Sequence, residues 1–275
     1  MVVPHPILRR AAALVVVGLL VAAAGQGPAG AQGAPVDCAK VTEFKEPWPI
    51  NIGLLATALR DYHRCRYDGD VKAVLDTARA FIAEQAPLTA KAAVVLDIDE
   101  TSLANWAQID HNNFAYVASG PCDLRSGSPC GQREWELAAQ ATAIAPTLEL
   151  VKFVKSLRDR DGNPVALFFI TGRHDDPFER TATEYNLRKV GYDGWTELIM
   201  RPDHPADEPV SVYKTARRSM IEGKDYGYRI VANIGDQISD LEGDRALRCF
   251  KVPNPFYYIP GQVDPHADLP CLRQQ

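Results

Sequence analysis

The chain has 275 residues, of which 46% are hydrophobic and 24% are charged, a balance that suits one globular domain with a real core. The formal net charge is −5; leaving out residues 1–31, which hold two of the 30 basic residues and none of the 35 acidic ones, makes it −7. The sequence has no basic run, so it is a poor candidate for binding nucleic acid or an anionic membrane.

The N-terminus has the layout of a secretory signal peptide. Arg9 and Arg10 precede an apolar run over residues 11–24, and small residues follow over 25–32. This run is shorter than the ~18 apolar residues of a membrane span, although an uncleaved anchor is the alternative. We expect cleavage of residues 1–31 after Ala31. The mature protein would then be secreted or periplasmic, without stable membrane association.

Six cysteines in an exported chain favour disulfide bonds over free buried thiols, which are the alternative. Cys122 and Cys130 flank a loop rich in Ser, Gly and Pro, and we expect them to pair. Two further pairs, Cys38–Cys65 and Cys249–Cys271, would hold the two ends of the chain. The close cysteine spacing of a zinc site is absent from the sequence.

Residues 32–92 are expected to form an N-terminal helical extension. After an irregular stretch to residue 50, apolar residues recur at helical spacing in two groups. These are Leu54, Leu55, Leu59 and Tyr62, and then Val71, Val74, Leu75, Ala78 and Phe81. We interpret His63 as a surface residue of the first helix rather than as a ligand.

Short apolar runs alternate with helical patterns over residues 93–262, and this alternation predicts an α/β core. Strands are expected at 92–96, 165–170, 198–200, 230–234 and 248–252, and helices at 147–159, 177–189, 211–222 and 238–246. Because the strands are apolar throughout, we expect a three-layer, Rossmann-like fold with a parallel sheet covered on both faces. Residues 263–275 form a C-terminal tail.

The segment of about 103–146 is too long for an ordinary connection between two strands. We interpret it as a small, mostly helical cap that is inserted after the first strand of the core and covers the strand ends. Most of its aromatic residues are expected to form the cap's own small core, with at most one or two facing a substrate. They are Trp106, Phe114, Tyr116 and Trp135.

Polar residues stand where three of these strands end. Asp97, Thr171 and Asp236 each follow an apolar run, and ligands of open α/β sheets bind at the carboxyl ends of the strands. Asp99 and Asp240 add two more acids on the same loops. Buried carboxylates need a partner, and a hard divalent cation such as Mg²⁺ suits oxygen ligands. Solvated turns or helix N-caps are the alternative for each acid taken alone.

A hydroxyl, backbone N–H groups and a lysine complete the set of polar groups. Thr171, Gly172 and Arg173 precede a helix start at Asp176-Pro177, where an anion can be held. With Ser211 as N-cap, Lys214 would lie in the first turn of a helix, where a cation costs up to ~1 kcal/mol. That position suggests an acidic or phosphate partner, and an ordinary surface lysine is the alternative.

Four segments in order resemble the motifs of the haloacid dehalogenase (HAD) superfamily. They are residues 94–101 (VVLDIDET), 169–173 (FITGR), Tyr213-Lys214 and 233–241 (NIGDQISDL). The chain is most similar to the subfamily IIIB acid phosphatases, which include plant vegetative storage proteins. Residues 191–195 (GYDGW) and 252–260 (VPNPFYYIP) also resemble this group. The resemblance extends from about residue 40 to 260.

The resemblance implies a phosphatase that uses Mg²⁺ and an aspartyl-phosphate intermediate. Asp97 would be the nucleophile and Asp99 the general acid and base. Thr171, the Gly172 N–H, Arg173 and Lys214 would bind the phosphate. Magnesium would bind Asp97, the main-chain carbonyl of Asp99, and Asp236. Supporting roles would fall to Asp240, Asn105 and Glu100.

Other functions are compatible with parts of the pattern. A non-enzymatic storage or binding protein could use the same fold, but the storage proteins that lack the nucleophile differ from this chain at Asp97. Arg173-His174 resembles a histidine acid phosphatase motif, but Asp175 follows where that motif needs glycine. Export and the cap argue against a receiver domain.

The expected substrate is a small phosphomonoester. The sequence leaves open which phosphomonoester it is, and it also leaves open the oligomeric state.

Overall fold

The computed structural model describes residues 51–203, 208–224 and 226–259, all within one compact unit that spans Asp37–Gln275. The expected signal peptide, the tail, Cys38 and Cys271 lie outside the described residues. None of the helices in the described ranges combines the length and the apolar composition of a membrane span.

Five parallel strands form the central sheet, in the order β5-β4-β1-β6-β7. They are β1 (Ala92–Leu96), β4 (Ala166–His174), β5 (Glu197–Arg201), β6 (Arg229–Gly235) and β7 (Arg248–Lys251). All residues of β1 are buried, as expected for the central strand of a covered sheet. Leu96 is in register with Phe169 of β4 and Ile234 of β6, so the residues that follow these three emerge at one edge.

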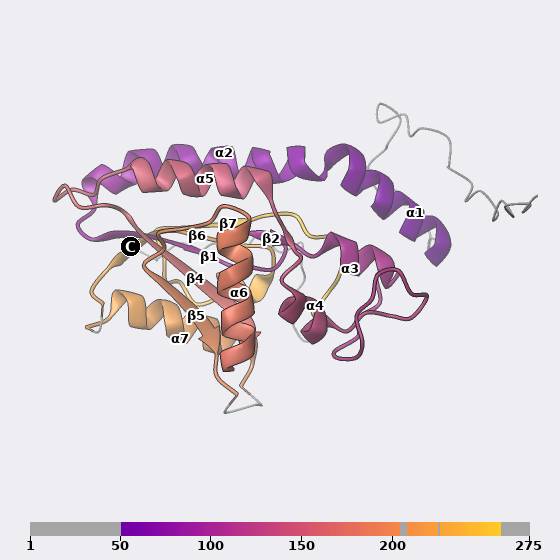
Figure 1. Cartoon of the computed structure of the whole chain (residues 1–275). Coiled ribbons are helices and arrows are strands. Elements are labelled where there is room, and N and C mark those ends of the chain that lie inside the picture. Colours follow the sequence, from indigo (N-terminus) through magenta and orange to yellow (C-terminus); the bar gives the residue numbers. More distant parts are fainter. Residues whose placement is uncertain (1–50, 204–207, 225, 260–275) are drawn as a thin grey trace, which may run out of the picture. The chain divides into compact units, whose positions relative to one another are not determined.

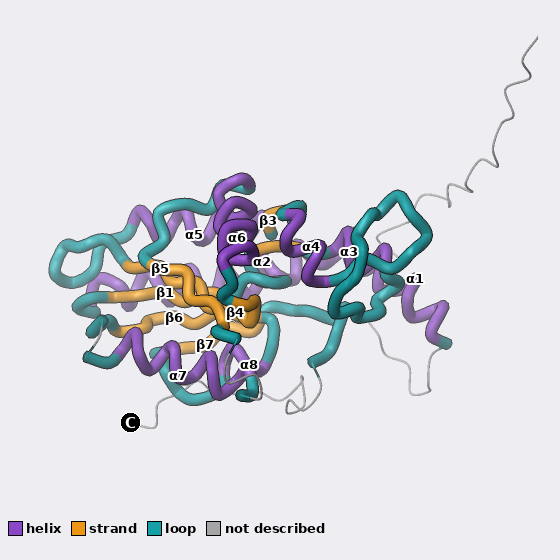
Figure 2. The backbone as a smooth tube through the Cα atoms, turned by 60° about the horizontal axis from the view of Figure 1, so that its bottom comes forward, coloured by secondary structure: helices purple, strands orange, loops and turns teal. Residues whose placement is uncertain are grey.

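Helices cover both faces of the sheet (Figures 1 and 2). Ala92, Val94 and Leu96 belong to a core shared with α2 (Asp68–Gln85) and α5 (Ala145–Ser156). The alternate residues Ala93 and Val95 pack on the other side, with Tyr213 and Ile221 of α7 (Val210–Glu222). The three-layer α/β fold expected from the apolar strands is confirmed.

Two further helices follow strands of the sheet. The start of α6 (Pro177–Lys189) is as predicted, since the Asp176 side chain accepts hydrogen bonds from the N–H groups of Phe178 and Glu179. Helix α8 (Ile238–Leu241) is shorter than the expected 238–246. The predicted N-cap at Ser211 is wrong, because α7 begins at Val210 and its N-cap is Pro209, two residues before the predicted one. Lys214 is therefore beyond the first turn, and the dipole argument for its role does not apply.

The segment of about 103–146, which was predicted to be mostly helical, contains less helix than expected. Helix α3 (Trp106–His111) has six residues and α4 (Gln132–Ala138) has seven, while β2 (Leu103–Ala104) and β3 (Thr142–Ala143) form a small antiparallel pair. Pro121 and Pro129 interrupt any longer helix between α3 and α4. The predicted Cys122–Cys130 disulfide is present. Cys65 and Cys249 are also disulfide-bonded.

The N-terminal helices pack against this segment through aromatic rings. Helix α1 (Ile52–Tyr62) continues through a π-helical turn, η2 (His63–Tyr67), into α2, and a short 3-10 turn, η3 (Ala86–Leu88), ends the pair. The interpretation of His63 as a surface residue is wrong. Its ring is half-buried and stacks on Trp106 with centroids 3.6 Å apart, and burial lowers its pKa. Trp106 thus packs outside its own segment, also against Phe256.

Candidate active site

Asp97 and Asp99 follow β1 at the edge of the sheet where the strands end. The Asp97 N–H donates to the carbonyl of Ile234 at 3.0 Å, which continues the ladder between β1 and β6 by one residue. Ile98 is fully buried, and its carbonyl accepts from the N–H groups of Ser102 and Leu103. The chain therefore turns sharply, with Glu100 at φ 52°, directly after the two acids. The buried Ile98 side chain thus anchors the loop that carries both of them.

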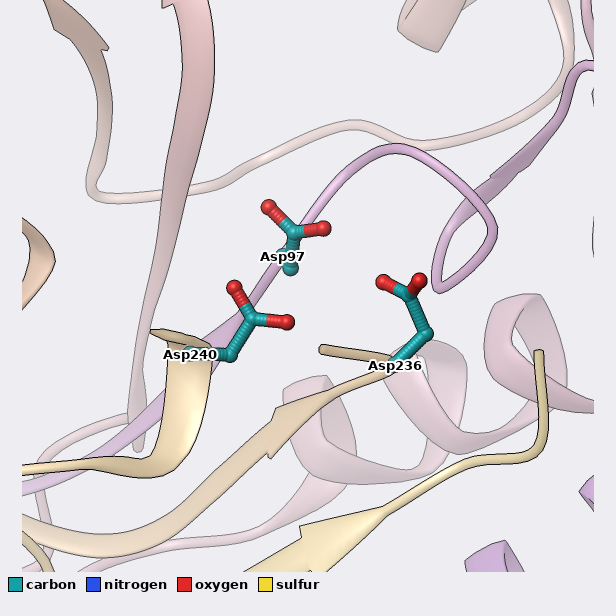
Figure 3. A group of neighbouring side chains, drawn as sticks. All are labelled: Asp97, Asp236 and Asp240. Atoms are coloured by element: carbon teal, nitrogen blue, oxygen red, sulfur yellow. The ribbon is translucent and has the colours of Figure 1, made fainter. Parts of the chain in front are cut away.

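Asp97, Asp236 and Asp240 form a buried cluster of carboxylates (Figure 3). One oxygen of each lies within 4.8 Å of the others. Burial raises the pKa of Asp97, with Asp240 and Asp236 adding to the effect, and burial together with Asp240 raises the pKa of Asp236 to about 6. Like charges held this close in a dry site favour a cation between them.

Lys214 supplies one positive charge to this cluster from α7. Its Nζ lies 2.6 Å from Asp97 Oδ1 and also donates to Asp240 Oδ1. Burial alone would lower the pKa of Lys214, but Asp240 and Asp97 more than offset it and hold the pKa well above its usual value. The lysine is therefore a buried, charged partner of two acids, and the interpretation as an ordinary surface lysine is wrong.

Asp236 is surrounded by neutral donors. Its Oδ1 accepts from Thr101 Oγ1 at 3.1 Å, and its Oδ2 accepts from Gln237 Nε2 at 2.6 Å and Asn254 Nδ2 at 2.8 Å. None of these three donors was given a role from the sequence, although all three lie in segments that resemble the family. The signal for Asn254 was its position just after the strand run at 248–252.

Asp99 is not a member of this cluster and pairs with Arg173. Arg173 donates to both Asp99 oxygens, most closely from Nη2 to Oδ1 at 2.6 Å, and Nη1 donates to Thr183. Asn105 Nδ2 also donates to Asp99 Oδ1 at 2.8 Å. Burial alone would raise the pKa of Asp99, but Arg173 and Asn105 hold it below its usual value. The guanidinium expected at the phosphate is thus engaged with an acid.

Thr171 and Gly172 lie near the end of β4, which extends to His174 and therefore continues past the predicted strand end at residue 170. Thr171 is fully buried, and its Oγ1 accepts from the Arg173 N–H at 3.2 Å. A Cβ at Gly172 would meet only Val210 Cγ1, at 3.8 Å, so protein packing does not demand glycine there. The exposed ring of His174 contacts Asp203 at 3.1 Å.

Two cavities meet at Asp99. The aromatic cavity, of about 500 Å³, is lined by Phe114, Tyr116, Phe256, Tyr257 and Tyr258 together with Asp99 and Asn105. The polar cavity, of about 820 Å³, is lined by Arg133, Glu136, Gly172, Arg173, His174 and Arg201 together with Asp99. Tyr116 and Gln132 line both cavities, so the segment between β1 and β4 contributes to each of them.

Comparisons with known proteins identify a family to which the chain is similar. The model of the HAD superfamily, subfamily IIIB (acid phosphatase), matches residues 46–260. The stem 28 kDa glycoprotein of Glycine max is 33% identical over 206 residues, which is 74% of this chain and 74% of that protein. Acid phosphatase 1 of Solanum lycopersicum is 32% identical over 60% of this chain and 58% of that protein.

A solved structure shares the fold. The class C acid phosphatase from Bacillus anthracis aligns with a TM-score of 0.54 and 20% identity, over 76% of this chain and 87% of that chain. At this identity the likeness concerns the fold alone.

Proposed function

Because this chain belongs to subfamily IIIB of the HAD superfamily, the acid phosphatases, we propose that it is an exported, Mg²⁺-dependent phosphatase that hydrolyses small phosphomonoesters through an aspartyl-phosphate on Asp97. The observation that carries the proposal is the convergence of Asp97, Asp236, Asp240 and Lys214 at one edge of the sheet.

Asp97 is proposed as the nucleophile. The contact with Lys214 at 2.6 Å supports this role, because a buried ammonium favours the ionised carboxylate and opposes the rise in the pKa of Asp97 that burial causes. Lys214 would also offset the charge of the phosphoryl group, whose oxygens Thr171 and the Gly172 N–H would hold. In phosphoryl transfer, positioning and charge stabilisation of this kind provide most of the catalysis.

Asp99 is proposed as the general acid and base. It lies two residues from the nucleophile and lines both cavities, so a leaving group in either cavity would be within its reach. It would protonate the leaving oxygen and then accept a proton from the water that hydrolyses the intermediate. The geometry favours Arg173 and Asn105 as residues that orient Asp99, rather than Arg173 as a direct phosphate ligand.

The residues present fit a magnesium ion. Three carboxylates and one lysine leave the cluster two charges short of neutrality, which a divalent cation would supply. Asp97, Asp236 and the main-chain carbonyl of Asp99 would hold the ion. Asp240 would support the site through its contacts with Lys214 and the Gln237 N–H. When bound, magnesium would neutralise charge on the phosphoryl oxygens.

The segment of about 103–146 is proposed as the cap that selects the substrate, because residues from it line both cavities. Disulfide bonds at Cys65, Cys122, Cys130 and Cys249 support export into an oxidising compartment after cleavage of residues 1–31. With a net charge of −5, the chain is not expected to bind nucleic acid.

Turnover of p-nitrophenyl phosphate by the purified protein tests this proposal. We expect hydrolysis with Mg²⁺, loss of activity with EDTA and recovery when Mg²⁺ is restored. Asp97→Asn should abolish turnover while the protein stays folded, and Asp175→Asn, which changes an exposed acid outside the cluster, should not. A folded wild type that is inactive with Mg²⁺ between pH 4 and 8 would favour the storage or binding alternative.

A further inference from the structure

The two carboxylate oxygens of Asp99 carry unequal numbers of hydrogen-bond donors. Oδ1 accepts from Arg173 Nη2 at 2.6 Å, from Asn105 Nδ2 at 2.8 Å and from Arg173 Nε at 3.2 Å. Among the described residues, Oδ2 accepts from Arg173 Nε alone, at 3.1 Å. An oxygen with three donors has no site left for a proton, so Oδ2 is the oxygen that can carry one.

The Asn105 amide directs its nitrogen at Asp99 because its oxygen accepts a hydrogen bond from Trp135. Trp135 Nε1 donates to Asn105 Oδ1 at 2.8 Å, and an indole N–H can only donate. The amide nitrogen also contacts Glu100 Oε2 at 3.2 Å. If the Asn105 amide were flipped, its NH₂ group would face the Trp135 N–H, and its oxygen would face Asp99 Oδ1. The chemistry of its neighbours therefore determines the orientation of Asn105.

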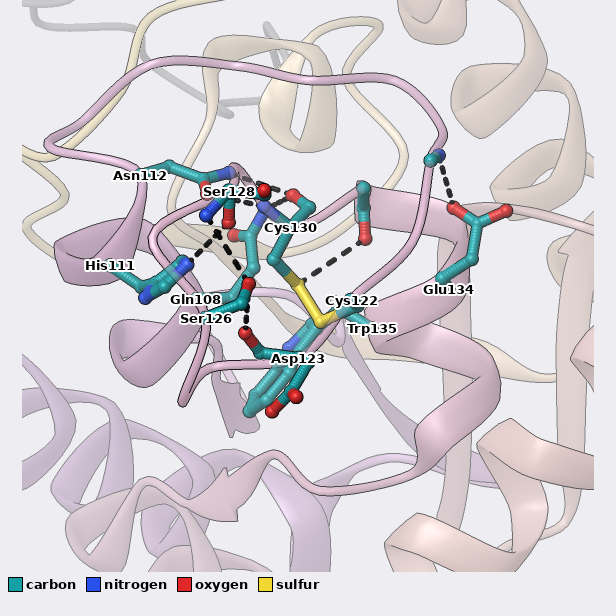
Figure 4. The surroundings of a disulfide bond; sticks show 12 residues. Gln108, His111, Asn112, Cys122, Asp123, Ser126, Ser128, Cys130, Glu134 and Trp135 are labelled. Carbon is teal, nitrogen blue, oxygen red and sulfur yellow. Dashed lines mark hydrogen bonds between the residues drawn. A yellow bond between two sulfur atoms is a disulfide. The ribbon is translucent and has the colours of Figure 1, made fainter.

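Trp135 is buried outside both cavities. Its side chain is 2% exposed, and it lines neither of the two cavities that meet at Asp99. It lies on α4, which follows the loop closed by the Cys122–Cys130 disulfide (Figure 4). The Cys130 carbonyl at the end of that loop accepts from Asn112 Nδ2 at 2.8 Å, which holds the start of α4 close to α3.

We propose that Trp135 and Asn105 are positioning residues of the acid–base step, which turn Oδ2 of Asp99 toward the leaving-group oxygen. The inference rests on the proposed function. In that step an Asp97 oxygen bonds to phosphorus and the bond from phosphorus to the leaving oxygen breaks. The electron pair of that bond stays on the leaving oxygen, which takes the proton from Asp99 Oδ2.

The dependence of the rate on the leaving group tests this role. A p-nitrophenolate leaves without a proton, whereas the alkoxide of an alkyl phosphate such as glycerol 2-phosphate needs one. Misdirecting Oδ2 should therefore slow hydrolysis of the alkyl ester much more than that of the aryl ester. A merely structural change would slow both esters to the same degree.

We expect Trp135→Phe, which keeps an aromatic ring but loses the N–H, to lower kcat about tenfold or more on glycerol 2-phosphate and less than about threefold on p-nitrophenyl phosphate. Asn105→Ala should show the same selective loss and decides the question if Trp135→Phe does not fold. Trp195→Phe is the matched control, because Trp195 packs on Phe169 and Arg188 away from Asp99. It should not change the ratio of the two rates.

Equal losses on the two esters in a folded variant would overturn the inference while leaving the proposed function intact. A folded wild type that hydrolyses neither ester with Mg²⁺ would overturn the proposed function, and this inference with it.

Discussion

Lys214 holds two buried carboxylates next to each other. Its side chain is 6% exposed and contacts both Asp97 and Asp240, whose side chains are 7% and 2% exposed. Burying an ionised group without a partner is costly, and removing one member of a buried pair leaves the other uncompensated. Loss of this lysine is therefore expected to lower stability as well as to impair the proposed chemistry.

Lys214→Met should expose this double role. Without magnesium, the loss of the cation should destabilise the fold by about 3–5 kcal/mol, and with magnesium the metal should restore part of that stability. Turnover should stay about 100-fold or more below wild type even with the metal, because the charge opposite the phosphoryl group is gone.

Thermal melts with EDTA and with Mg²⁺, together with kcat, measure these effects. Lys152→Met on the exposed side of α5 is the control. Wild-type kcat in the Lys214 variant would contradict the expected result.

At the scale of elements, close packing between the end of β6 and α8 determines where Asp240 lies. Asp240 completes a capping box with Gln237, and its backbone carbonyl accepts from Arg218 Nη1 of α7 at 2.5 Å and Asn233 Nδ2 of β6 at 2.7 Å. A Cβ on Gly235 would lie 2.3 Å from the Asp240 side chain. The glycine therefore lets the acid pack directly on the strand.

Gly235→Ala should displace α8 and weaken both the fold and the metal site. We expect a loss of about 1–3 kcal/mol in the free energy of unfolding, typical of an overpacked core, and weaker Mg²⁺ binding. Gly69→Ala in α2 is the matched control, because a Cβ there meets nothing within 4 Å. That change should stabilise the helix by about 0.5–1 kcal/mol.

Chemical denaturation and magnesium titration would check both glycine variants. Unchanged magnesium affinity in Gly235→Ala would show that the packing of Asp240 on Gly235 does not determine the metal site.

At the scale of the whole molecule, buried acids should make the metal-free protein sensitive to pH. Burial and neighbouring acids raise the pKa of Asp236 to about 6 and that of Glu100 to about 8, and they also raise the pKa of Asp97. The folded state therefore binds more protons than the unfolded chain above pH ~4. The stability that these groups contribute is complete below their unfolded pKa and is lost as the pH rises through the folded pKa.

In EDTA the protein should therefore melt at a lower temperature at pH 8 than at pH 5. Magnesium should reduce this difference, because the cation compensates Asp97 and Asp236 when they are ionised. Asp236→Asn should also reduce the difference in melting temperature between pH 5 and pH 8 in EDTA. Differential scanning calorimetry at the two pH values, with and without Mg²⁺, measures the effect. A metal-free protein that is more stable at pH 8 would contradict it.

The candidate site could be predicted from the sequence where its residues follow strands. Asp97, Thr171 and Asp236 each come directly after an apolar run, and the ends of parallel strands meet at one edge. Thr101, Asn254 and Trp135 could not be given their contacts in this way. Their partners lie 135, 18 and 30 residues away along the chain, and no local pattern marks such pairs.

The start of α7 and the position of His63 also differ from the predictions. Ser211 is a favourable residue type for an N-cap, but α7 begins at Val210 after Pro209 and has no side-chain cap, so Ser211 lies inside the helix. His63 was predicted to lie at the surface of the first helix, whereas it begins the π-helical turn and its ring stacks on Trp106.

The layers of this protein, the order in which polar residues follow the strands and the cysteine pair of the inserted segment could all be predicted from the sequence. These depend on local periodicity and on spacing, which a linear chain records directly. The fold alone shows that Arg173 pairs with Asp99, that Lys214 joins Asp97 to Asp240, and that Trp135 donates to Asn105. Each of these depends on distances between segments remote in sequence, which packing of the layers fixes.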